Sequence, residues 1–246
     1  RDSLKSELTE VFKDQTIESI WSNRKIALCI PTTNMSQDQP WVFKTPHLKG
    51  KTRDNKYTLI DVCLATAAAP IFFPLAVTDI PDADNKYNVF SDGGLWANNP
   101  VMIGMTEALE IAGPKQPIEI ISIGTCATKM GKTISKSEAN WGLLKWKGGT
   151  EIVSASLGAQ SYGYGFIAQQ LSKHLDRPCT VVRLPNSPPS PEQAALIGLD
   201  KASENSCKAM TDLGRNDAEA LHGRLTRGDK NLQIVQDIFT SLCEFS

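Results

Sequence analysis

Short apolar runs alternate with amphipathic stretches along most of the chain. The clearest buried strand is the run Ile-Glu-Ile-Ile-Ser-Ile at residues 118–123, in which isoleucine dominates. The run at residues 25–31 ends in a polar stretch, and residues 41–43 are expected to pair beside it. The runs that predict strands are residues 25–31, 41–43, 87–90, 118–123 and 180–184.

Helical periodicity marks the stretches between these runs. In residues 3–13 the apolar side chains fall on one stripe, as in an amphipathic helix. Asn99 followed by Pro100 is a helix-start signal, with asparagine as the N-cap and proline at the first helical position. Gly163 and Gly165 are expected to interrupt a long helix. The predicted helices are residues 3–13, 16–22, 58–67, 100–112, 151–175, 191–213 and 231–243.

This order of elements predicts an α/β fold with a mostly parallel central sheet, since strands alternate with helices. The sequence contains no internal repeat and no linker that would divide it. We therefore expect residues 1–246 to form a single domain, with residues 214–246 as a C-terminal helical extension. A chain of 246 residues is long enough to bury one sizeable core.

Composition narrows the range of partners. The formal net charge is −1, and 41% of the residues are hydrophobic, which is ordinary for a globular protein. The balanced charge argues against binding a nucleic acid duplex through an overall electrostatic field. The sequence has no apolar run long enough for a transmembrane helix, and its first residues are charged rather than signal-like. A cytoplasmic location, with peripheral membrane association at most, is expected.

The cysteines predict neither a metal site nor a disulfide framework. Their spacing contains no Cys-x-x-Cys pair and no nearby histidine, and several of them lie within apolar runs. We expect them to pack as small hydrophobic side chains in a reducing compartment. The six are Cys29, Cys63, Cys126, Cys179, Cys207 and Cys243.

Other candidate ligands have ordinary structural explanations. His47, His174 and His222 are expected to be satisfied surface histidines. Calcium binding by Asp82 and Asp84 is conceivable, but the rest of a calcium loop is absent around them. Gly124 and Thr125 follow a predicted strand without the lysine of a phosphate-binding loop, so they are expected to border the active-site cleft. No metal and no cofactor is predicted.

The strongest candidate for catalysis is Asp92, which follows an apolar strand and precedes Gly93 and Gly94. A carboxylate at the end of a strand is held rigidly, and glycines allow tight turns and close approach of a partner. Asp-Gly is also a common turn, in which the aspartate side chain hydrogen-bonds its own backbone. The flanking segments favour a catalytic base over a simple turn.

These flanking segments resemble the patatin-like phospholipases. The resemblance rests on Ala65-Thr-Ala-Ala-Ala-Pro-Ile-Phe-Phe-Pro74, on Phe90-Ser-Asp-Gly-Gly-Leu-Trp-Ala-Asn-Asn-Pro100, and on the strand and loop Ile121-Ser-Ile-Gly-Thr125. It implies a three-layer α/β/α domain that hydrolyses lipid acyl esters with a Ser–Asp dyad and no cofactor. Asp92 would be the base that takes the proton of the serine, and Gly93 and Gly94 would form its turn.

The nucleophile of that dyad is missing from the sequence. No serine has glycine at both the −2 and +2 positions, so the Gly-x-Ser-x-Gly elbow is absent, and so is a glycine-rich oxyanion loop. We expect both elements in sequence that precedes this chain, and we expect the 246 residues alone to be inactive. The alternatives are a non-catalytic patatin-like module that binds lipid or protein, or an unrelated α/β binding domain with an exposed Asp92.

The resemblance also implies partners. A phospholipid or another acyl-ester lipid is the expected substrate, reached by transient contact with a membrane surface. Some bacterial members are effectors that nucleotide signals switch on, so a nucleotide activator and a homo-oligomer are left open. Residues 141–147 have the composition of an interfacial contact or lid, although their tryptophans are more simply explained as core. The core interpretation is also favoured for Tyr162, Tyr164 and Phe166 over an acyl-chain channel or a subunit contact.

Overall fold

The computed structural model describes residues 2–80, 86–126, 134–140, 142, 146, 149–198 and 201–243. Contacts divide the chain into two compact units. The first comprises Arg1–Glu107 with Gly149–Tyr164, and the second Ala108–Gly148 with Gly165–Ser246. The single domain expected over the whole chain stays a prediction.

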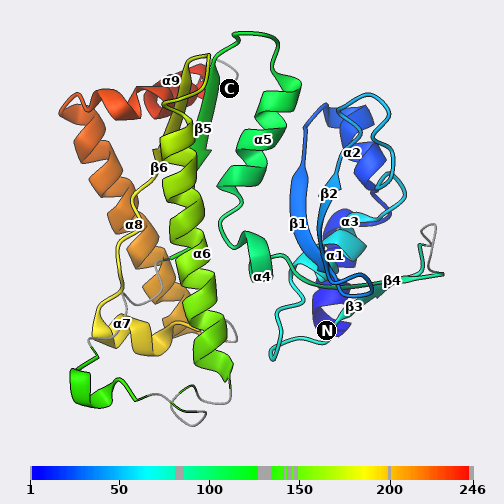
Figure 1. The fold of residues 1–246 in the computed structure, drawn as a ribbon, viewed down its shortest axis with the longest axis horizontal. Helices are drawn as coiled ribbons and strands as arrows, with labels where there is room; N and C mark the ends of the chain where they lie inside the picture. Colours follow the sequence, from blue (N-terminus) through cyan, green and yellow to red (C-terminus); the bar gives the residue numbers. More distant parts are fainter. Residues whose placement is uncertain are drawn as a thin grey trace. The chain divides into compact units, whose positions relative to one another are not determined.

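Helices and a small sheet make up the first unit (Figure 1). The sheet has the strand order β2-β1-β4-β3. The strands are β1 (Cys29–Asn34), β2 (Gln39–Lys44), β3 (Ala76–Thr78) and β4 (Asn88–Asp92). The helices are α1 (Asp2–Phe12), α2 (Ile17–Arg24), α3 (Leu59–Thr66), α4 (Gly94–Ala97) and α5 (Val101–Ile111), and α6 (Thr150–Leu171) runs from this unit into the second.

Local capping explains where several helices begin. Thr16 and Ser19 form a capping box at α2, in which each side chain bonds the backbone N–H of the other. Asn99 Oδ1 accepts the N–H of Val101 at 3.2 Å, as the helix-start signal predicts for α5. The expected helices at 3–13, 16–22 and 58–67 are confirmed to within two residues at each end.

A mostly parallel sheet was expected, and the strands of this sheet do not form one. All three pairings, β1 with β2, β1 with β4, and β3 with β4, are antiparallel. The reason is visible for the first pair, because only residues 35–38 separate the two strands, and so short a connection closes a hairpin. Residues 41–43 do pair beside β1, as predicted.

Aromatic side chains fill the core between this sheet and its helices. Phe43 lies edge-to-face with Tyr57 at 4.8 Å and with Phe90 at 5.2 Å between ring centroids. Trp41 contacts Phe90 from β2, and α3 contacts β1 and β4. This packing holds β4, and with it the end of the Asp92 strand, against a rigid core.

The second unit contains the one parallel pairing among the described strands. Strand β5 (Ile118–Ser122) pairs with β6 (Cys179–Arg183) in register from Ile118 opposite Cys179 to Ser122 opposite Arg183. A small core of Val182, Leu232, Ile234 and Val235 lies beside it. The other elements are the 3-10 turns Lys136–Glu138 and Lys230–Leu232, and the helices α7 (Pro191–Leu196), α8 (Glu204–Thr226) and α9 (Gln233–Cys243).

Two helix predictions in the C-terminal half are wrong. Helix α6 continues through Gly163, since an interior glycine costs a helix only about 1 kcal/mol. The single helix expected at 191–213 is two helices, because Ser203 caps a new start at α8, which then continues past Gly214. The boundary expected at residue 214 therefore falls inside α8. The chain is α/β, and no described helix combines the length and apolar character that crossing a membrane requires.

Candidate active site

Asp92 is the last residue of β4, and its backbone is held on both sides. It pairs with Thr32 of β1 in the sheet register. Its N–H donates to the carbonyl of Ala68 at 3.0 Å, and its own carbonyl accepts the hydroxyl of Thr33 at 3.1 Å. The position of this carboxylate is therefore fixed by two neighbouring segments rather than by a free loop.

The Ala-rich segment and the Asp-Gly-Gly segment meet at Ala68. Its carbonyl accepts both the N–H of Asp92 and the hydroxyl of Ser91, the latter at 3.1 Å. Thr32 adds a hydrogen bond from its hydroxyl to the carbonyl of Ser91 at 2.6 Å. These hydrogen bonds hold the two segments together through the main-chain carbonyls of Ala68 and Ser91.

The two glycines are required by close approaches, not by unusual backbone angles. A Cβ at Gly93 would lie 2.2 Å from the carbonyl oxygen of Pro31, far inside contact distance. The N–H of Gly94 donates to Asp92 Oδ1 at 2.5 Å, and a Cβ at Gly94 would lie 2.9 Å from the same oxygen. Both residues let β1 and the Asp92 carboxylate pack tightly against the start of α4.

The two carboxylate oxygens of Asp92 allow both interpretations, the turn and the catalytic base. Its Oδ1 makes the bond to Gly94 that an Asx turn requires. Among the described residues no hydrogen bond occupies Oδ2, so this oxygen is available to a reacting group. Burial raises the pKa of the Asp92 carboxyl, and the Gly94 N–H offsets part of that rise. Asp92 is half-buried, which disagrees with the exposed aspartate of an unrelated turn.

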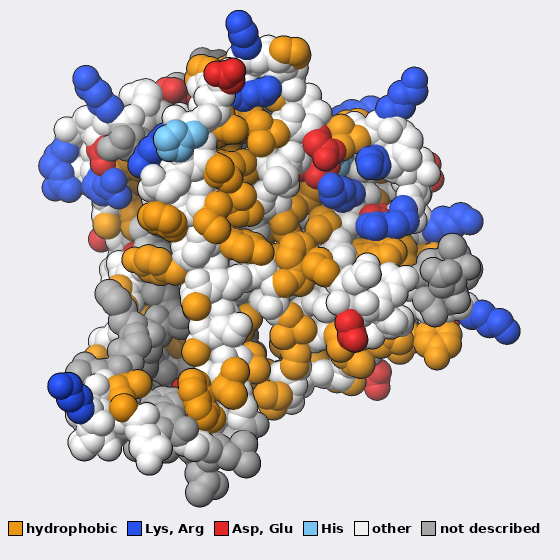
Figure 2. Space-filling view, viewed as in Figure 1, with side chains coloured by type: hydrophobic (Ala, Val, Ile, Leu, Met, Phe, Trp, Pro, Cys, Tyr) orange, Lys and Arg blue, Asp and Glu red, His pale blue; other side chains and the backbone are white. Residues whose placement is uncertain are grey.

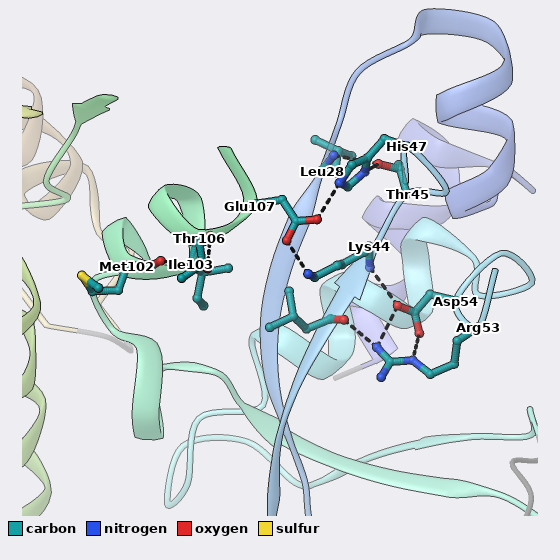
Figure 3. A network of polar contacts seen from close by, with 11 residues as sticks. Leu28, Lys44, Thr45, His47, Arg53, Asp54, Met102, Ile103, Thr106 and Glu107 are labelled. Carbon is teal, nitrogen blue, oxygen red and sulfur yellow. Dashed lines mark hydrogen bonds and ion pairs between the residues drawn. The ribbon is translucent and has the colours of Figure 1, made fainter. Parts of the chain in front are cut away.

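A second polar cluster joins the β1–β2 hairpin to α5 (Figure 3). Glu107 receives an ion pair from Lys44 and a hydrogen bond from His47 Nε2 at 2.7 Å. His47 Nδ1 lies 2.8 Å from the hydroxyl oxygen of Thr45, which also accepts the N–H of Leu28. Burial alone would raise the pKa of Glu107, but hydrogen bonds from Lys44 and His47 outweigh it and lower the pKa.

This cluster corrects the expectation for His47. Its side chain is 2% exposed and is paired with a carboxylate 60 residues away, so it is not a surface histidine. Sequence reasoning also missed Lys44 and Glu107, because no local spacing links a strand end to the middle of a helix. His174 and His222 are exposed, as expected.

Other predicted features are only partly placed. Tyr162 and Phe166 are 86% and 61% exposed, so they are not core residues. They lie four positions apart on one face of α6, away from the buried Ala168. Cys29, Cys63, Cys179 and Cys207 are free thiols. Gly124 and Thr125 follow β5 in the second unit. Asp82, Asp84 and most of residues 141–147 lie outside the described residues.

Comparison with known proteins places these motifs in a family. A sequence model described as patatin-like phospholipase matches residues 1–105, which include the Asp92 segment. A cGAMP-activated phospholipase of Vibrio cholerae is 33% identical over 207 residues, covering 80% of this chain and 56% of the relative. A cGAMP-activated phospholipase of Pseudomonas aeruginosa is 37% identical over 149 residues, covering 59% of this chain and 41% of the relative.

The similarity extends to plant proteins. Patatin-like protein 1 of Oryza sativa subsp. indica is 28% identical over 207 residues, covering 75% of this chain and 49% of the relative. The chain thus spans about half the length of the curated relatives that it matches. The match to the patatin-like phospholipase family thus covers residues 1–105, which carry the Ala-rich segment, Asp92 and its two glycines.

Proposed function

We propose that the protein is a lipid acyl hydrolase of the phospholipase A type, in which Asp92 is the general base of a Ser–Asp dyad. The observation that carries this proposal is the Asp92 carboxylate: its backbone is fixed at both ends, and its pKa is raised by burial. A carboxylate with a raised pKa accepts a proton more readily than an ordinary one.

In this mechanism Asp92 Oδ2 takes the proton of the serine hydroxyl as the serine oxygen attacks the acyl carbonyl carbon. The proton then passes to the alkoxide oxygen that leaves, which releases the lysolipid and leaves an acyl-serine. A water molecule, deprotonated by the same carboxylate, hydrolyses the acyl-serine and regenerates both groups. The Gly94 N–H holds Oδ1, so that Oδ2 keeps its orientation through both halves.

The serine itself is proposed to lie in sequence outside these 246 residues. Ser91 is adjacent to Asp92, but successive side chains of a strand point to opposite faces. Its side chain is buried and donates to the carbonyl of Ala68. Ser91 therefore serves as a structural neighbour of the base and not as the nucleophile.

A phospholipid surface is the proposed source of the substrate. The segment that follows Ala68 exposes several large apolar side chains, which Figure 2 shows as orange atoms over β3 and β4 toward the lower right. Membrane-contacting proteins use such side chains to enter the boundary between headgroups and acyl chains. We name this surface the apolar edge, and it consists of Ile71, Phe72, Phe73, Leu75, Val77 and Tyr87.

Nucleotide control is proposed from the relatives. Two of them are named cGAMP-activated phospholipases, and both align with a large part of this chain. We propose that a cyclic dinucleotide of this kind switches on hydrolysis here too, as part of an effector.

Phospholipid hydrolysis by the full-length protein tests the proposal, with and without cGAMP. Asp92→Asn and Asp92→Ala should each lower the rate by about 10²–10⁴-fold, the usual contribution of a general base. Asp38→Asn is the matched control, because Asp38 is an exposed aspartate in the β1–β2 turn, and its rate should equal that of the wild type. Full activity in both Asp92 variants would remove Asp92 from the mechanism.

A non-catalytic patatin-like module is the second candidate, favoured by the absence of a Gly-x-Ser-x-Gly elbow from the sequence. It predicts vesicle binding by the full-length protein without hydrolysis of any acyl ester, whether or not nucleotide is present.

A further inference from the structure

Three side chains with metal-binding atoms converge in the first unit, well away from one another in sequence. Cys29 opens β1, His47 follows β2, and Glu107 lies on α5. The Cys29 sulfur, a His47 ring nitrogen and a Glu107 carboxylate oxygen all lie within 4.8 Å of one another. The side chains of Glu107 and His47 are buried, and Cys29 is half-buried, so the group does not lie on the open surface.

The donor types match zinc. A sulfur, an imidazole nitrogen and a carboxylate oxygen are the three ligand classes of protein zinc sites, and three protein ligands leave a fourth position for water. Zinc bond lengths of about 2.0–2.3 Å imply ligand atoms about 3.5 Å apart. The three ligand atoms lie within 4.8 Å of one another, so a separation at that limit has to shorten by about 1.3 Å to reach this spacing. His47 Nε2 and Glu107 Oε1, now 2.7 Å apart, have to move slightly apart.

His47 is already oriented as a ligand would be. Histidines that bind metal nearly always bond a second group through the other ring nitrogen. Here His47 Nδ1 lies 2.8 Å from the hydroxyl oxygen of Thr45, a fully buried residue, while Nε2 faces Glu107. When Nε2 binds the metal, the neutral ring carries its one proton on Nδ1, which donates to the hydroxyl oxygen of Thr45, and Glu107 stays a carboxylate.

The net charge of the site stays at zero if zinc displaces the Lys44 ammonium from Glu107. Without a metal, the Lys44 ammonium neutralises Glu107. A zinc ion held by a thiolate and a carboxylate has the same net charge of zero, so the ammonium is no longer needed. The Lys44 side chain is 30% exposed and can extend into water.

We propose that Cys29, His47 and Glu107 form a zinc site that ties α5 to the β1–β2 hairpin, with Lys44 as the occupant that zinc displaces. Binding converts the Cys29 thiol to a zinc thiolate and releases one proton to solvent. Burial, followed by the charge of Glu107, raises the pKa of the free thiol to about 12, so the proton is present until the metal arrives.

Cobalt and zinc binding to the metal-free full-length protein test the site. Co²⁺ should give the thiolate-to-cobalt absorption band of a tetrahedral site in the wild type. It should be absent in Cys29→Ser and retained in Cys63→Ser, a matched half-buried cysteine on α3. The wild type should bind one more equivalent of zinc than Cys29→Ser. Equal stoichiometry, or a band that survives in Cys29→Ser, would overturn the proposal.

A variant of Lys44 keeps the test decisive even if Cys29→Ser folds poorly. Lys44→Ala removes the competing ammonium, so zinc should bind about tenfold more tightly than to the wild type, as measured by competition with a chromogenic chelator. A purely structural ion pair predicts no such gain. Unchanged or weaker zinc binding in Lys44→Ala contradicts the displacement of Lys44.

Discussion

The backbone N–H of Asp92 donates to the carbonyl of Ala68 at 3.0 Å, which joins the two sequence segments that define the site. Ala68 comes directly after the turn that ends α3, and Asp92 is the last residue of β4. Because one carbonyl also takes the hydroxyl of Ser91, a shift of the Ala-rich segment would move the base with it. Hydrogen bonds to the main-chain carbonyl of Ala68 thus fix the backbone of Asp92, and through it the place from which the carboxylate projects.

Asp92→Asn should stabilise the fold at neutral pH. Burial raises the folded-state pKa of Asp92 above its ordinary value of 3.8, so ionisation is more costly in the folded than in the unfolded state. Below pH 3.8 Asp92 is protonated in both the folded and the unfolded state, so its burial does not lower the free energy of unfolding of the wild type. As the pH rises through the raised pKa, the free energy of unfolding of the wild type falls, whereas that of Asp92→Asn does not.

Urea denaturation of both proteins between about pH 3.5 and 7 measures this difference. The stability gap should open above pH 3.8 and then become constant. A gap that is the same at every pH would show that burial is not its origin.

Gly93→Ala should destabilise the protein by about 1–3 kcal/mol, the range for overpacking a tight contact. A Cβ at this position would lie 2.2 Å from the carbonyl oxygen of Pro31, and main-chain atoms of β1 cannot move aside cheaply. The matched control is Gly104→Ala in α5, where a Cβ has no neighbour within 4 Å. That variant should gain about 0.5–1 kcal/mol from helix propensity.

Thermal or urea unfolding distinguishes the two variants, because the free energy of unfolding should fall in Gly93→Ala and rise in Gly104→Ala. If Gly93→Ala loses less than about 0.5 kcal/mol, the close approach of Gly93 to β1 is not as tight as the structure has it.

Phe72→Ser combined with Phe73→Ser should weaken binding to phospholipid vesicles by about tenfold. Both rings belong to the apolar edge, and burying a phenylalanine side chain fully contributes about 1.5–3 kcal/mol, of which an exposed ring supplies part. Tyr162→Ser, which removes an exposed aromatic on α6, should leave vesicle binding unchanged. Sedimentation with vesicles measures the partition, and an equal effect of all three substitutions would speak against a specific edge.

Much of the site could be predicted from sequence because its parts are local. Asp92, Gly93 and Gly94 follow one another, and the cap at Asn99 lies within two residues of the N–H that it accepts. Caps and periodicity act over a few residues. The helices α1, α2, α3 and α5 could therefore also be predicted from the sequence.

The rest depends on contacts that a linear pattern does not carry. Apolar runs predict strands but not their direction, so the antiparallel sheet was missed, although the short connection at 35–38 was a signal for a hairpin. Strand β3 has three residues, too few to show a period. Glu107 meets His47 only after α5 packs beside the hairpin, and periodicity alone cannot tell the exposed Tyr162 from a core residue.

The ion pair of Lys44 and Glu107 should show strong coupling when it is removed stepwise in buffer that contains a metal chelator. Lys44→Met leaves a carboxylate that is only 7% exposed without its ammonium, and Glu107→Met leaves His47 without its acceptor. Each should cost about 1–3 kcal/mol, the penalty for a buried polar group that loses its partner. The double variant should cost at least about 1 kcal/mol less than the sum, because apolar side chains then replace both partners. Lys49→Met is the control, since Lys49 is exposed, and its effect should add to that of Glu107→Met. Additivity of Lys44→Met with Glu107→Met would mean that the pair does not hold α5 to the hairpin.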